Sequence, residues 1–214
     1  MNTSLEVQLL DSEFALQDYF AYQNLLSAVD WNALNIANWE ALYPDRPKVD
    51  FQIAHNNKAI VLHYTVEEQF IKAQYVRPNE AVWEDSCVEF FISFDNKEHY
   101  YNLEFNPLGT GLIGYGTSDK QNRKRLSAED IRTVETFTSV TSTLSAKRWS
   151  MVLVIPLSVF SQSSIDSLSG NEFHANFYKC GDNLPNPHFI SWTKIDNGTP
   201  NFHLPEYFGS IVFK

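Results

Sequence analysis

The chain has 214 residues, of which 43% are hydrophobic, 14% aromatic and 20% charged. This composition excludes a disordered chain, because it supplies enough apolar surface for a sizeable core. The 16 basic and 26 acidic residues give a formal net charge of −10, which would repel nucleic acid and anionic membrane surfaces alike. We therefore expect a globular protein with no nucleic-acid or membrane partner, while its oligomeric state is left open.

The amino-terminal residues carry no export signal, and no apolar stretch approaches the roughly 20 residues that span a bilayer. From this we expect a cytoplasmic protein, unless a leader has been removed. No repeat or linker divides the sequence, which predicts a single domain over residues 1–214. Residues 1–45, with Trp31 and Trp39, have no regular period, and we expect them to wrap around or cap the domain.

After this segment the hydrophobic pattern has the period of two that is typical of strands. Two alternating runs flank the Asn56-Asn57 turn and predict a hairpin, and residues 149–155 are apolar on both faces, as expected of a central strand. The only helix candidates are 66–76 and 156–162, and a weak strand is expected near 134–141. Many short strands separated by turns predict an all-β fold: an antiparallel, jelly-roll-like β-sandwich with one or two short helices.

Three of the predicted strands carry hydrogen-bonding side chains on the side opposite the core. These residues are Glu89, Asn102, Glu104, Asn176 and Tyr178. A polar sheet face of this kind suits a sugar, whose hydroxyls bind carboxylates and amides and whose C–H faces lie against aromatic rings. The aromatic candidates are Trp83, Trp192 and Phe202. The same pattern is explained by a face that is merely solvated, with the Trp residues packed at the ends of the sandwich. The spacing of the residues does not distinguish a sugar-binding face from a solvated one.

Four stretches together resemble the family 9 carbohydrate-binding modules. They are WEDSCVEFFISFD (83–95), YYNLEFN, NFYKCGD and the closing segment ISWTKIDNGTPNFHLPEYFGSIVF. The resemblance covers most of the chain from about Val49 onward. It implies a jelly-roll sandwich that holds the end of a saccharide between two Trp rings, without catalysis.

Carried over by residue, the resemblance implies that Trp83 is the first ring and Glu89 a carboxylate that binds hydroxyls. This sequence departs from the family where Glu104 replaces a basic side chain, Phe202 a Trp and Tyr178 an amide. Because a carboxylate in place of a guanidinium reverses the charge of one contact, the family's specificity does not transfer. The predicted site is thus Trp83, Glu89, Tyr178 and Phe202, supported by Asn102, Glu104 and Asn176, with Trp192 at the rim.

The resemblance also raises the question of structural calcium, which family members often hold through oxygen ligands. Asp85, Asp95 and Asn96 could supply such oxygens, although no EF-hand-like spacing is present. Cys87 and Cys180 fall on the same strand faces as Glu89 and Tyr178. The sequence leaves open whether these two cysteines form a disulfide or are buried free thiols.

The remaining alternatives concern enzymes and basic patches. Glu89 with Glu104 or Asp85 could flank a scissile bond, but the GxSxG, HExxH, P-loop and GxGxxG signatures are absent. We therefore expect no enzyme and no catalytic residues. The basic run 120–125 is interpreted as a solvated loop. The alternative functions are an accessory or protein-interaction domain of a polysaccharide-processing system that has lost sugar binding and, less favoured, a glycoside-processing enzyme.

Overall fold

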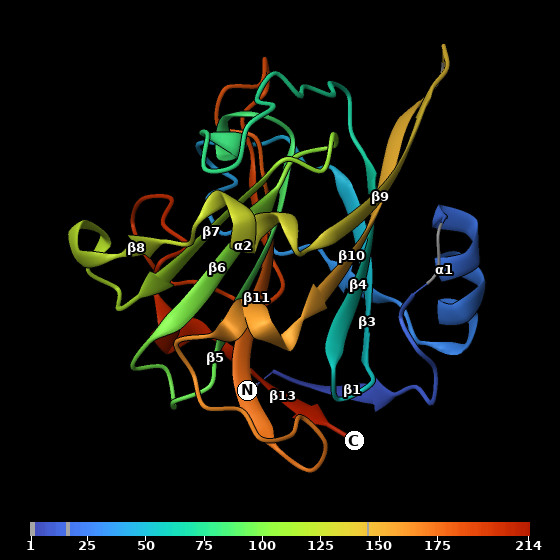
Figure 1. Cartoon of the computed structure of the whole chain (residues 1–214). Helices are drawn as coiled ribbons and strands as arrows, with labels where there is room; N and C mark the ends of the chain where they lie inside the picture. The colour runs from blue at the N-terminus through green and yellow to red at the C-terminus, as the bar shows by residue number, and fades with distance from the viewer. Residues whose placement is uncertain (1–2, 16–17, 145) are drawn as a thin grey trace.

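A computed structural model describes residues 3–15, 18–144 and 146–214. Strands dominate it, and the described residues contain two short α-helices, α1 (Tyr19–Leu25) and α2 (Ala128–Arg132) (Figure 1). Five short 3-10 helices among these residues connect other elements: η1 (Leu26–Ala28), η2 (Val82–Glu84), η3 (Lys120–Asn122), η4 (Leu157–Phe160) and η5 (Pro205–Tyr207). Within the described ranges, we find no helix long and apolar enough to cross a membrane. The predicted all-β class is confirmed.

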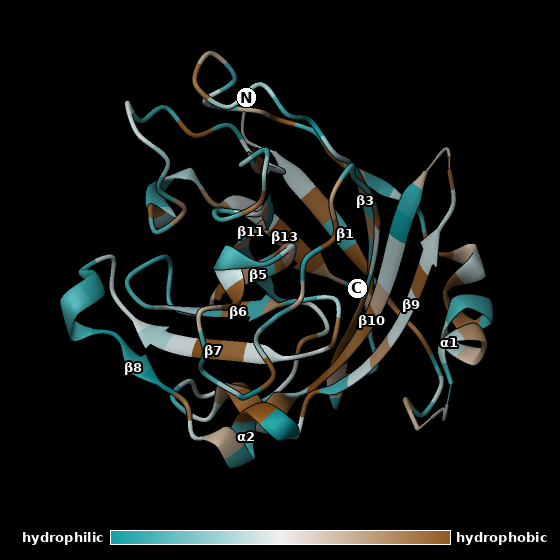
Figure 2. Cartoon of the chain, turned by 90° about the horizontal axis from the view of Figure 1, so that it is seen from above, coloured by the Kyte–Doolittle hydropathy of each residue, from teal (hydrophilic) through white to brown (hydrophobic). Residues whose placement is uncertain are grey.

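One curled sheet forms two halves that face each other across the core (Figure 2). The first half contains β5 (Cys87–Ser93), β6 (Tyr100–Phe105), β7 (Gly111–Gly116), β8 (Lys124–Arg125), β11 (Glu172–Cys180), β12 (Phe189–Ser191) and β13 (Gly209–Phe213). The second half contains β2 (Asn32–Leu34), β3 (Lys48–His55), β4 (Ala59–Glu67), β9 (Glu135–Ser142) and β10 (Lys147–Pro156). The predicted sandwich is therefore built from a sheet that folds over on itself.

Strand β1 (Ser4–Leu9) joins the two halves, and it corrects the prediction of a purely antiparallel sandwich. Its first residues pair in parallel with β13, and Gln8 and Leu9 pair in parallel with the end of β3. The sheet is consequently mixed. The amino-terminal segment does more than wrap the domain, since Val7 is fully buried in the main core. Residues 1–2 and 16–17 of the predicted wrapping segment lie outside the described residues.

The main core lies between the two halves and follows the alternation seen in the sequence. Phe51 of β3 and Phe177 of β11 stack across it, with their ring centroids 4.0 Å apart. The hairpin of β3 and β4 forms as predicted, with Asn57 in the left-handed region at φ 62°. Strand β10 is central and covered on both faces, because its odd-numbered residues 149–155 enter the main core while Val152 and Val154 pack beneath α1.

The helix predicted over 66–76 is wrong. Strand β4 continues to Glu67, and an irregular segment follows. The backbone N–H groups of Gln74 and Tyr75 donate to the Asp85 carboxylate, so this segment is held by a distant side chain instead of by helical hydrogen bonds. The second candidate, 156–162, contains η4, and the weak strand near 134–141 is β9.

Candidate functional site

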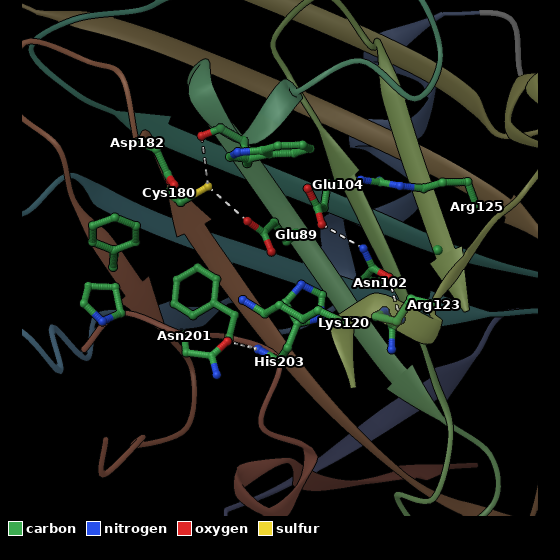
Figure 3. Close-up of a pocket in the computed structure, with 15 residues that line it drawn as sticks. Glu89, Asn102, Glu104, Lys120, Arg123, Arg125, Cys180, Asp182, Asn201 and His203 are labelled. Atoms are coloured by element: carbon green, nitrogen blue, oxygen red, sulfur yellow. Dashed lines mark hydrogen bonds between the residues drawn. The ribbon is translucent and has the colours of Figure 1, made fainter. Parts of the chain in front are cut away.

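A cavity of about 390 Å³ opens on the outer face of the first half, over β5, β6 and β7 (Figure 3). Its lining combines acidic, basic, amide and aromatic side chains. The residues are Trp83, Glu89, Asn102, Glu104, Gly114, Lys120, Arg123, Arg125, Cys180, Asp182, Phe189, Pro200, Asn201, Phe202 and His203. Strands supply the floor, while η2, η3 and the segment around Phe202 supply the walls.

Strand register brings the polar floor residues together. Glu89 of β5 lies directly opposite Glu104 of β6. One row along, Asn102 of β6 pairs with Gly114 of β7, which pairs with Arg125 of β8. Gly114 leaves room for its neighbour, because a Cβ there would lie 2.6 Å from Asn102 Oδ1. The missing side chain therefore keeps the floor open between Asn102 and Arg125.

A short hydrogen-bond chain orders the floor. Arg123 Nη2 donates to Asn102 Oδ1 at 2.6 Å, and Asn102 Nδ2 donates to Glu104 Oε1 at 2.8 Å. The other oxygen, Glu104 Oε2, is buried and has no hydrogen-bond partner among the described residues. A buried acceptor without a partner is costly unless a ligand or water satisfies it. The cavity thus contains one fixed acceptor that is ready for a donor.

The carboxyl groups that line the cavity have raised pKa values. Burial, together with the neighbouring Glu104 carboxyl, raises the pKa of Glu89 well above its usual range. Burial also raises the pKa of Glu104, although the Asn102 hydrogen bond and the nearby arginine charges act in the opposite direction. Two buried carboxyls this close do not both ionise readily, so ionisation of both together is disfavoured. Burial raises the pKa of Asp182 to about 6.

Aromatic rings form the apolar part of the lining. Trp83 lies on η2 at the entry to β5 and is partly exposed. Phe202 is 8% exposed, and its ring stacks on that of Tyr178 with centroids 4.1 Å apart and an interplanar angle of 11°. Trp39 packs against Phe202 at 6.0 Å. Trp39 of the amino-terminal segment thereby packs against the ring of Phe202, although the two residues are more than a hundred positions apart in the sequence.

Comparison with known families decides the identity of this domain. The family model described as carbohydrate-binding family 9 matches residues 22–213. The chain belongs to carbohydrate-binding family 9. The match begins well before Val49, where the resemblance in the sequence starts, and so includes the last part of α1 and all of β2.

Solved structures of similar proteins agree with this assignment. A candidate carbohydrate-binding protein from Bacteroides uniformis ATCC 8492 is 38% identical, with a TM-score of 0.91 and coverage of 100% of both chains. A family 9 module from Caldicellulosiruptor kristjanssonii, solved with glucose, is 14% identical, with a TM-score of 0.61 over 99% of this chain and 96% of that one. The same organism's family 9 module with cellotriose is 13% identical, with a TM-score of 0.59 and coverage of 99% and 94%. The two modules show the shared fold. No protein of curated function matches the chain.

The structure of this family 9 domain places five of the eight predicted site residues around one cavity. They are Trp83, Glu89, Asn102, Glu104 and Phe202. Tyr178 lies outside the lining: it is fully buried behind Phe202, and its hydroxyl donates to the Phe202 carbonyl at 3.2 Å. The predicted polar face is therefore partly a second core, since Tyr178 packs there with Phe91 and Phe208 beneath the closing segment.

Asn176 and Trp192 also lie outside the cavity. Asn176 is fully buried, and its side chain donates to Thr193 Oγ1 at 2.6 Å and accepts from the Thr193 backbone N–H. Trp192 packs into the main core, with its ring 5.5 Å from that of Phe177. Asn176 therefore ties β11 to the segment after β12, and Trp192 fills the core instead of the rim.

Sequence reasoning missed the basic wall of the cavity. The run 120–125, interpreted as a solvated loop, contributes Lys120, Arg123 and Arg125 to the lining. His203 also lines it, and burial lowers the pKa of this imidazole to about 3. The available signal was a basic run that follows a glycine-rich strand in a chain of net charge −10. The run's position over the site depends on the pairing of β7 with β8, which spacing does not reveal.

Cys87 and Cys180 are directly opposite each other on β5 and β11. The strands are therefore neighbours, as a disulfide would require, but both thiols are free and buried in the structure. Cys180 Sγ donates to Glu89 Oε1 at 3.0 Å, which links the thiol to the cavity floor. Burial raises the pKa of Cys87 to about 12, so its thiol is protonated and unreactive.

The oxygen atoms predicted for calcium are not arranged for a shared ion. Asp85 Oδ2 accepts three N–H groups, from Gln74, Tyr75 and Asn106. Asp95 accepts from Ser93 and His99 in a separate turn. Asp85 precedes β5 and Asp95 follows it, so the two carboxylates lie at opposite ends of that strand and cannot share one ion. Asp85 Oδ1 is buried without a hydrogen-bond partner among the described residues, and structural calcium stays a prediction.

Proposed function

We propose that this family 9 domain binds a saccharide non-catalytically in the cavity over β5, β6 and β7. The observation that carries the proposal is Glu104 Oε2, a buried acceptor that lines the cavity and lacks a partner among the described residues. A sugar hydroxyl would supply the missing donor. Other hydroxyls of the sugar would form hydrogen bonds with Glu89 and Asn201, which also line the cavity.

The aromatic lining fits the rest of a sugar ring. Trp83 presents a partly exposed indole, and Phe202 is held in a fixed orientation by Tyr178 and Trp39. Pyranose C–H faces pack on such rings, while the edge hydroxyls reach the polar floor. The phenyl ring offers less area than an indole, so Trp83 should contribute more of the stacking energy.

The arrangement of carboxyls favours binding over hydrolysis. Glycosidases place two carboxyl groups on either side of the scissile bond. Glu89 and Glu104 instead lie side by side on neighbouring strands of one floor. A pair placed in this way can exchange hydrogen bonds with one face of a ligand, but its two carboxyl groups do not lie on opposite sides of a glycosidic bond.

The decisive experiment is saccharide titration of the purified chain, followed by calorimetry and by Trp fluorescence. The panel should include glucose and cellotriose, which the solved family 9 modules hold, together with a wide glycan array. We expect saturable binding that Trp83→Ala weakens by at least about tenfold while circular dichroism is unchanged.

Trp31→Ala is the matched control, because Trp31 is 47% exposed and lies outside the cavity. It should leave saccharide binding unaltered. Failure of every glycan to bind would favour the protein-interaction alternative, and formation of cleaved product would establish an enzyme.

A further inference from the structure

The cavity concentrates positive charge on one wall in a strongly acidic chain. Lys120, Arg123 and Arg125 line it together, from η3 to β8. They are three of only 16 basic residues in a chain of net charge −10. A cluster of this kind needs a cause beyond general solubility, which the acidic surface already provides.

Arg123 is a fixed cation that has no carboxylate hydrogen-bond partner in the part of the chain that the structure describes. Its guanidinium donates to the carbonyl oxygens of Gly116, Thr117 and Tyr100 and to the amide oxygen of Asn102. All four acceptors are neutral, so these bonds orient the charge but do not neutralise it. The guanidinium also lies 3.9 Å from the centroid of the Tyr100 ring. The wall therefore carries a preorganised positive charge.

Lys120 and Arg125 extend this charge towards the aromatic entry. Neither side chain makes a hydrogen bond or an ion pair with any residue that the structure describes. Arg125 instead lies over the Trp83 ring, with its guanidinium carbon 5.7 Å from the centroid. Both side chains are exposed and lie among the residues that line the cavity, as Figure 3 shows.

The acidic groups of the cavity do not fully offset these three cations. Glu104 interacts electrostatically with both arginines, and Glu89 and Asp182 both interact with Lys120. Burial raises the pKa of both Glu89 and Glu104, and the Glu104 charge raises that of Glu89 further, so ionisation of both carboxyls together is disfavoured. These carboxyls therefore weaken the positive potential of the wall without cancelling it.

We infer that the cavity selects a saccharide with an anionic group, a hexuronic acid, over the neutral sugar of the same configuration. The inference rests on the proposed function and names its ligand class. The sugar ring would stack on Trp83, its hydroxyls would reach Glu104, and its carboxylate would lie against the wall of Lys120, Arg123 and Arg125. A sulfate ester at the same carbon offers the same charge, so the experiment separates the two sources.

The test compares matched sugars by calorimetry on the full chain at neutral pH. The pairs are glucose with glucuronate, galactose with galacturonate and mannose with mannuronate, and glucose 6-sulfate is a further arm. We expect the uronate of the binding pair to be preferred by about fivefold at low ionic strength. The preference should fall towards one as salt rises to about 0.3 M, because salt screens exposed charges.

Charge variants locate the effect. Lys120→Gln and Arg125→Gln should each reduce the uronate-to-neutral affinity ratio by about twofold or more. Lys124→Gln is the control, since Lys124 is exposed on the same strand as Arg125 but lies outside the cavity. It should leave the ratio unchanged, and an equal effect of Lys124→Gln would overturn the inference.

The possible results separate the two claims. Equal or tighter binding of the neutral sugar would overturn the uronate preference while leaving saccharide binding intact. Preference for glucose 6-sulfate over glucuronate would assign the wall to sulfated sugars and overturn the choice of uronate. If no sugar in any arm binds, the proposed function fails together with the inference.

Discussion

Glu89 and Glu104 face each other on neighbouring antiparallel strands, and both carboxyl groups are buried in the floor of one cavity. Like charges directly opposite in a sheet are destabilising, and burial increases that cost. A fold does not need this pair for its core, because apolar side chains would pack there without it. Unfavourable placement of ionisable groups in a cavity is typical of sites shaped for binding.

The first prediction concerns Glu104→Gln. The amide keeps an acceptor for Asn102 and removes the repulsion with Glu89. We expect the free energy of unfolding at neutral pH to rise by about 1 kcal/mol, and saccharide affinity to fall by about tenfold because a charged acceptor is lost. Urea unfolding and calorimetry measure the two effects. The exposed Glu98→Gln is the control, and a loss of both stability and affinity in Glu104→Gln would contradict the assignment.

The second prediction distinguishes support from ligand contact at Tyr178. Its hydroxyl donates to the Phe202 carbonyl, and its ring lies behind that of Phe202. Tyr178→Phe should therefore lower the free energy of unfolding by about 1 kcal/mol and leave saccharide affinity within about twofold, as the stacked ring remains. Tyr178→Leu should weaken binding further by releasing Phe202. Strong loss of affinity in Tyr178→Phe with unchanged stability would instead place the hydroxyl on the ligand.

The third prediction follows from the carboxyl of Asp182. Burial raises its pKa from the ordinary value of 3.8 to about 6 in the folded chain. Between these values the folded state binds more protons than the unfolded state, so this group lowers stability as pH rises through the window. The loss is about 2–3 kcal/mol and is complete above the folded pKa.

The difference between wild type and Asp182→Asn isolates this effect from the buried histidines, whose lowered pKa values give the opposite slope. Urea unfolding at several pH values from 4 to 7 is the measurement. The variant should gain stability relative to wild type as pH rises. Asp196→Asn, at an exposed position, is the control. Parallel curves for wild type and Asp182→Asn would show that this carboxyl titrates normally.

The fourth prediction concerns Cys87 and Cys180. Both thiols are buried, and burial raises both of their pKa values, so little thiolate forms at neutral pH. We expect neither to react with an aromatic disulfide reagent in the native chain, and both to react once it is unfolded in urea. Mass spectrometry without reductant should give the mass of two free thiols. A mass lower by two hydrogens in the native chain would reveal a disulfide that the structure does not contain.

The sequence by itself determined which side of each strand a residue faces. Alternation has a period of two, and it is a local property of the backbone, so the positions of Glu89, Asn102 and Glu104 on the outer face followed without knowledge of the neighbours. The hairpin at Asn57 and the central strand β10 are predictable for the same reason. The family resemblance added Trp83 as a ring position, which alternation does not provide.

Only the tertiary structure decided what covers that face. Phe202 stands in front of Tyr178 because the closing segment crosses the sheet, and Trp192 turns into the core one residue after β12 ends. The basic wall reaches the cavity because β8 pairs with β7. These contacts join residues that are far apart in sequence, and they depend on loop paths and strand order. No periodic pattern encodes such paths, because a loop's course is fixed by the packing of the whole domain.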